Sequence, residues 1–148
     1  MKSKLIVATC LFILLNVFGG CSTSRVGTTV PEDKRIPIKE GEAGSGVWKA
    51  FEYSMTYQYS LNRQNIQSPG KISINGDIEL TGGALDSLNI WVNMLDSGGR
   101  ILDHKSVFMS GFRSSDVEPS FKVELDTPPG MDAMSFSHTA TERRGRNR

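Results

Sequence analysis

An alternation of apolar and polar side chains is the most regular feature of this chain. From Phe51 to Leu61 every second residue is apolar or aromatic, and each residue between them is polar. A period of two is typical of a β-strand with one buried face. Shorter or weaker versions of the pattern occur in five further segments, which are residues 71–80, 88–94, 100–108, 121–125 and 134–137. We therefore predict six strands.

Turn signals separate these segments, and no stretch repeats its apolar residues at the spacing of a helix. Asp96-Ser97-Gly98-Gly99 predicts a tight turn, because glycine readily takes the positive φ that hairpins need. Pro128-Pro129-Gly130 interrupts the chain before the last strand. The 15 glycines and 6 prolines among 148 residues agree with many turns. Short strands joined by turns indicate an all-β antiparallel sandwich.

The third predicted strand and the turn after it resemble a known motif. Residues 92–96, Val-Asn-Met-Leu-Asp, occupy the place of an F-x-L-Y-D motif, and Gly99-Arg100-Ile101-Leu102 is similar to the glycine turn and return strand that follow it. Phe121 matches the phenylalanine that opens a later strand. From residue 72 to 140 the chain thus resembles the immunoglobulin-like domains of small bacterial lipoproteins of the FxLYD type. The resemblance implies an immunoglobulin-like Greek-key sandwich of six to seven strands, without assigned catalytic residues.

The N-terminus has the layout of an export signal. Lys2 and Lys4 precede an apolar run over residues 5–18, which is shorter than the roughly 20 residues that a transmembrane helix needs. The run leads into Gly19-Gly20-Cys21-Ser22, which resembles a bacterial lipoprotein signal, where small residues precede a cysteine that becomes the lipidated first residue. Phe18 departs from the leucine that is usual three residues before that cysteine. An ordinary cleaved signal or a retained anchor is the alternative.

The two cysteines of the chain support lipidation of Cys21. Cys10 lies within the predicted signal peptide, residues 1–20, so the mature chain keeps one cysteine at its first position and forms no internal disulfide. Each acyl CH₂ buried in a membrane contributes about 0.8 kcal/mol, so several acyl chains anchor firmly. Serine at position 22 commonly accompanies outer-membrane sorting in this family. We therefore expect a lipid anchor at the periplasmic face of the outer membrane.

Composition divides the mature chain into three parts. Residues 21–46 are rich in Ser, Thr, Gly, Pro and charges, which predicts a flexible tether with a reach of roughly 25–30 Å. Residues 47–141 form the predicted sandwich domain, and residues 142–148 form a basic tail that we expect to be disordered. The alternative for the tail is contact with anionic lipid or lipopolysaccharide, since arginine pairs well with phosphate. Its arginines are Arg143, Arg144, Arg146 and Arg148.

Two groups of aromatic residues are candidates for binding. Tyr53, Tyr57 and Tyr59 form a row suited to stacking on sugars, but a buried core requires the same alternation, and we favour the core. Trp91 lies out of step with the apolar row, on the face that should be wet. Together with Leu95 it marks a possible partner contact. Cover by the tether or by an edge loop is the equal alternative.

Little in the sequence indicates catalysis or a cofactor. His104 and His138 are the only histidines, and neither has a companion at the spacing of a metal site. No nucleophile elbow, P-loop or Gly-rich dinucleotide motif occurs. We expect no catalytic residues, no metal and no cofactor. A net charge of +1 and an envelope location argue against nucleic acid as a partner.

The sequence therefore predicts a membrane-anchored envelope lipoprotein that acts as a non-enzymatic binding or scaffolding module, with an envelope protein as its partner. The alternative is a receptor for a small ligand or carbohydrate that uses an aromatic sheet face. Both share the anchor at Cys21 and differ in what the sandwich contacts.

Replacement of Cys21 by serine tests the anchor. Because serine offers no thiol for lipidation, we expect the Cys21→Ser protein to leave the membrane fraction, as measured by cell fractionation and immunoblotting. Cys10→Ser is the control, since this residue lies within the predicted signal and its loss should leave membrane association intact. A full-sized mature Cys21→Ser protein in the membrane pellet would contradict lipidation.

Overall fold

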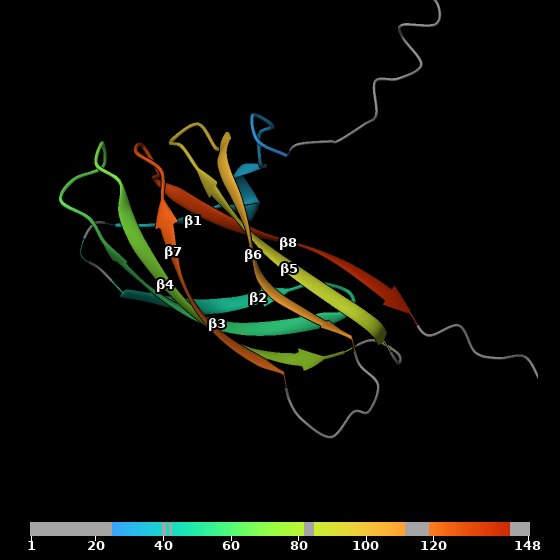
Figure 1. Ribbon diagram of the computed structural model, residues 1–148. Coiled ribbons are helices and arrows are strands. Elements are labelled where there is room, and N and C mark those ends of the chain that lie inside the picture. The colour runs from blue at the N-terminus through green and yellow to red at the C-terminus, as the bar shows by residue number, and fades with distance from the viewer. Residues whose placement is uncertain (1–24, 40, 42, 82–84, 112–118, 143–148) are drawn as a thin grey trace, which may run out of the picture.

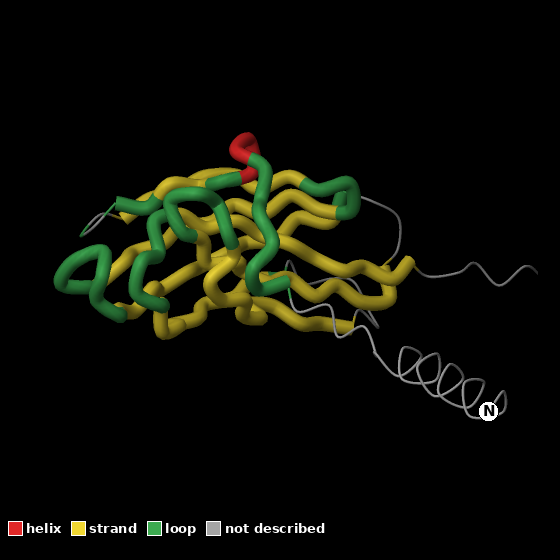
Figure 2. Tube along the Cα trace, turned by 90° about the horizontal axis from the view of Figure 1, so that it is seen from above, coloured by secondary structure: helices red, strands yellow, loops and turns green. Residues whose placement is uncertain are grey.

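The computed structural model describes residues 25–142 apart from residues 40, 42, 82–84 and 112–118 (Figure 1). These residues form eight strands and one turn of 3₁₀ helix, η1. The bounds are η1 Glu32–Lys34, β1 Ile36–Pro37, β2 Ala43–Lys49, β3 Tyr53–Asn62, β4 Gly70–Leu80, β5 Leu85–Leu95, β6 Ile101–Gly111, β7 Ser120–Thr127 and β8 Ala133–Glu142. Figure 2 views the molecule from above and shows the strands in two layers, with η1 on the outside.

The two layers are antiparallel sheets with the strand orders β1-β8-β5-β6 and β2-β3-β4-β7. The β5–β6 hairpin stays within one sheet, whereas the connections β4–β5, β6–β7 and β7–β8 cross between the sheets. This order places β4 beside β7 and β5 beside β8, as an immunoglobulin fold places strands B and E and strands C and F. The two-residue β1 occupies the position of the last immunoglobulin strand, G. The predicted all-β antiparallel sandwich is confirmed, with eight strands instead of six to seven.

The core lies between the sheets and is built by the inward rows of the central strands. Met55 of β3, Ile74 of β4 and Ile90 of β5 are fully buried. On one side of the core, the ring centroid of Phe136 on β8 lies 5.6 Å from that of Trp48 on β2 and 5.2 Å from that of Tyr57 on β3. Aromatic contacts across the layers therefore close this side of the sandwich.

The predicted tight turn between β5 and β6 is confirmed, and it binds the N-terminal segment. The carboxylate of Asp96 accepts the backbone N–H groups of Gly98 and Arg100, both at 2.9 Å, and Gly99 has a φ of +80°. A Cβ at Gly99 would lie 2.1 Å from the guanidinium of Arg35, so the side chain of Arg35 packs directly on the turn. Gly99 is thus required both for its backbone conformation and for this close approach.

Residues 25–30, here called the N-terminal strap, lie along the outside of the β5–β6 hairpin. Gly27 donates its backbone N–H to the carbonyl of Ile101 at 2.8 Å, and Ile101 in turn donates to Thr28 at 2.8 Å. Val30 donates to the carbonyl of Gly99 at 2.9 Å. In Figure 1 the strap is the blue segment beside the β5–β6 turn. The described residues that pair with the sandwich thus include several that precede the predicted boundary at residue 47.

Two glycines of β2 explain why the composition of residues 43–46 predicted a flexible tether instead of a strand. Gly44 and Gly46 of β2 pair in register with Tyr59 and Tyr57 of β3. A Cβ at either glycine would come within 2.6 Å of the partner tyrosine side chain, so each ring lies over its glycine. Rings of this kind bury the backbone of an edge strand that has few side chains of its own. Because two of the three inward positions of β2 are glycines, this strand has no apolar alternation in its sequence.

A methyl group at Gly76 tests the same type of packing in the centre of the sheet. Gly76 of β4 pairs with Phe121 of β7, and an added Cβ would meet the phenylalanine ring at 2.3 Å. We expect Gly76→Ala to lower the free energy of unfolding by about 1–3 kcal/mol, as overpacking does, in urea denaturation. Gly111→Ala is the control, because the nearest atom to its Cβ is the carbonyl oxygen of Asp86 at 3.6 Å. Equal losses in the two variants would contradict the packing role.

Candidate functional site

Trp91 lies on the outer face of the β1-β8-β5-β6 sheet and is half-buried. It pairs in register with Ser106 of β6 and Ser137 of β8. The indole stacks on the His104 ring, with 5.7 Å between ring centroids and an angle of 22° between the planes. The guanidinium carbon of Arg25, the first residue of the strap, lies 5.7 Å from the indole centroid. Trp91 is thus outward-facing, as its position in the alternation predicts, but the strap partly covers it.

A chain of hydrogen bonds continues from His104 into the sheet. Its Nδ1 lies 2.8 Å from Oδ1 of Asn93, and because an amide oxygen can only accept, Nδ1 carries the hydrogen. The Asn93 amide donates in turn to the hydroxyl of Ser135 at 3.1 Å. Asn93 and Ser135 are 3% and 1% exposed. These polar groups are therefore satisfied by one another rather than held ready for a reactant.

The surroundings of His104 disfavour its protonated form. Burial lowers the pKa of His104, and the nearby positive charge of Arg25 lowers it further, against a smaller opposing effect of Asp103. A neutral imidazole fits its stacked position against Trp91 and its single hydrogen bond to Asn93.

Leu95, the other residue predicted as a partner contact, is fully buried. It forms a small apolar cluster with Ile101 and Ala133 on the outer side of the sheet, and Val30 of the strap packs against this cluster. Val30 of the strap, a residue of the predicted tether, thus covers Leu95. Its side chain offers no surface to a partner while the strap is in place.

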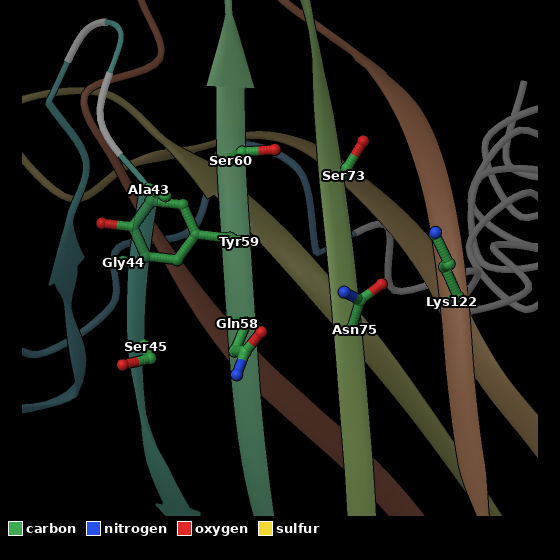
Figure 3. A pocket seen from close by; sticks show the side chains of 9 residues that line it. All are labelled: Ala43, Gly44, Ser45, Gln58, Tyr59, Ser60, Ser73, Asn75 and Lys122. Carbon is green, nitrogen blue, oxygen red and sulfur yellow. The ribbon is translucent and has the colours of Figure 1, made fainter.

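The outer face of the other sheet contains a polar hollow of about 570 Å³ (Figure 3). Four of its residues form one register row across all four strands: Ser45 of β2, Gln58 of β3, Asn75 of β4 and Lys122 of β7. The remaining lining residues are Ala43, Gly44, Tyr59, Ser60 and Ser73. The hollow thus presents hydroxyl and amide groups in ordered rows. The hollow has no signal in the sequence, because outward Ser, Gln and Asn residues also occur on an ordinary solvated face.

The tyrosine row proposed as a sugar-stacking face lies mostly in the core. Tyr53 and Tyr57 are 0% and 6% exposed, so the interpretation as core is confirmed for both. Burial raises the pKa of the Tyr53 hydroxyl well above its ordinary range. Tyr59 is half-buried, donates its hydroxyl to the carbonyl of Pro37 at 3.2 Å and reaches the hollow at its edge. An aromatic face formed by all three rings does not exist on the surface.

The second histidine has a structural environment. Nε2 of His138 lies 2.9 Å from the carboxylate of Glu52, and its ring contacts that of Tyr53 edge-on, with centroids 5.1 Å apart. Among the described residues, no three His, Cys, Asp or Glu side chains gather in a group able to hold a metal ion. Nor does the described part of the chain contain a helix long and apolar enough to cross a membrane.

The other sequence predictions fall outside the described residues. These are the signal peptide, lipidation at Cys21, and the arginines Arg143, Arg144, Arg146 and Arg148 of the basic tail. No family model, no curated protein and no solved structure matches this chain. The resemblance to FxLYD-type lipoproteins therefore stays a prediction.

The lowered pKa of His104 predicts a loss of stability in mild acid. The unfolded chain takes up a proton near a pH of about 6.5, whereas the folded protein resists protonation until a lower pH. The contribution of His104 is thus fully present above the unfolded pKa and is lost as pH falls through the folded pKa. We expect the unfolding free energy of His104→Gln, measured in urea, to fall less than that of the parent between pH values of about 7.5 and 5.5. An unchanged pH dependence would contradict this role.

Proposed function

We propose that this chain is a lipid-anchored, non-enzymatic binding module of the bacterial cell envelope, with the polar hollow as its binding surface. The signal-like N-terminus and Cys21 support the anchor and a location at the periplasmic face of the outer membrane. One observation supports the binding surface above all: the row Ser45, Gln58, Asn75 and Lys122, which crosses the four strands of one sheet and lines a hollow.

The lining favours a neutral chain rich in hydroxyl groups, such as an envelope glycan. Amide side chains donate and accept hydrogen bonds, and hydroxyls do both at one atom, which suits a ligand made of hydroxyl groups. Lys122 is the charged side chain among the nine lining residues, so no cluster of charge selects an ionic ligand. The volume of about 570 Å³ lies within the range of known ligand sites, about 300–1,000 Å³. Because the hollow lies on the face of a sheet, an extended ligand can enter from the side.

An ion pair lies at the border of this surface, and neither of its residues lines the hollow. Lys71 and Glu124 form an ion pair at 2.8 Å between β4 and β7, and both side chains are largely exposed. Glu124 pairs in register with the lining residue Ser73, so the ion pair lies at the border of the hollow. The side chains in the middle of the hollow remain uncharged, which again favours a neutral ligand over a strongly charged protein surface.

Substitutions in the central row test the binding surface. We expect the soluble Cys21→Ser protein to show saturable NMR shift changes at β2, β3 and β4 with a panel of neutral oligosaccharides. Gln58→Ala and Asn75→Ala each remove side-chain hydrogen bonds worth about 1 kcal/mol, so each should weaken binding roughly fivefold to tenfold. Thr56→Ala is the matched control, since Thr56 is exposed two residues from Gln58 on β3 and does not line the hollow. Shift changes confined to the other sheet would contradict this assignment.

A further inference from the structure

The docked strap leaves very little free chain between the lipidation site and the folded domain. Arg25 already accepts two hydrogen bonds from Thr28, one from its backbone N–H at 3.2 Å and one from its hydroxyl at 2.7 Å. Only three residues separate Cys21 from Arg25. Fully extended, this link spans at most about 14 Å between the two Cα atoms. The reach of 25–30 Å expected from a tether ending at residue 46 therefore no longer applies.

We propose that the outer face of β5 and β6 around Trp91 lies against the lipid headgroups of the membrane. This inference rests on the proposed lipidation of Cys21, because that cysteine fixes the point from which the short link starts. The guanidinium of Arg25 lies over the Trp91 ring, on the outer face of this sheet. An anchor within about 14 Å of Arg25 therefore brings this face, and not the opposite sheet, to the membrane surface.

The side chains of the face fit the boundary between water and lipid. Val26 of the strap and Met109 of β6 are 48% and 70% exposed, and they are two of the four large apolar side chains with high exposure among the described residues. Met109 pairs with Asn89, the next outward position of β5 before Trp91. Tryptophan favours the headgroup region, because its ring is apolar and its N–H is polar. Arg25 adds a cation suited to lipid phosphate.

This orientation leaves the opposite sheet open to the periplasm. The polar hollow lies on the outer face of the β2-β3-β4-β7 sheet, on the other side of the core. Its lining is made mainly of hydroxyl and amide groups with Lys122 at one end, and the exposed apolar residues Val47 of β2 and Phe51 of the β2–β3 turn lie outside it. One sheet thus faces the lipid and the other faces the ligand, with the core between them.

Distance-dependent quenching of single labels tests the orientation. The lipidated protein is reconstituted in vesicles of phosphatidylethanolamine and phosphatidylglycerol that contain headgroup spin-labelled lipid. A fluorophore is attached at Ser106→Cys, opposite Trp91, or at Thr56→Cys on the other sheet; both positions are exposed. We expect several-fold stronger quenching at position 106 than at position 56. A second pair, Met109→Cys and Lys49→Cys, should show the same difference and replaces the first if a variant misfolds.

The outcomes separate this inference from the proposed anchor. Mass spectrometry of the N-terminal peptide first establishes whether Cys21 carries acyl chains. If Cys21 is acylated but both label pairs are quenched equally, or more strongly on the β3 side, the orientation is wrong and the anchor stands. If Cys21 is unmodified, the anchor fails, and the membrane-facing role of Trp91 fails with it.

Discussion

Backbone pairing between the strap and the β5–β6 hairpin is the interaction on which the functional interpretation depends. Three hydrogen bonds join Gly27, Thr28 and Val30 to the end of the hairpin. Because this segment is held there, Leu95 is buried and Trp91 is partly covered. The same pairing directs the chain toward β1, which completes the sheet beside β8. A few backbone groups of the strap thus decide which surfaces of the described sandwich are covered.

Alternation predicted the strands whose inward side chains are large. The predicted segments 51–61, 71–80 and 88–94 are found as β3, β4 and β5, because each places apolar side chains against the facing sheet, although Phe51 lies before β3 and is exposed. Alternation does not reveal β1 and β2. β1 has only two residues, and two of the three inward positions of β2 are glycines, which are covered by rings such as Tyr57 of the neighbouring strand. A pattern read along one strand cannot show what its neighbour contributes.

The candidate site was only partly predictable, for a related reason. The outward position of Trp91 followed from its place in the alternation, but the cover by Arg25 joins residues 66 positions apart, and no local pattern reports it. The row of Ser45, Gln58 and Asn75 exists only after three strands adopt their register. Each residue taken alone is an ordinary polar surface residue. The hollow thus results from the register of the strands and not from the composition of any one strand.

The position of β1 also orders events during folding. Ile36 finds its partner in Met134, nearly one hundred residues later, and the strap needs the finished β5–β6 turn. Such distant pairings form late, since the intervening chain must first be organised. The strap and β1 are therefore expected to pair among the last elements of the sandwich. Under the proposed anchorage at Cys21, docking of the strap would shorten the link to the membrane only after the β5–β6 turn has formed.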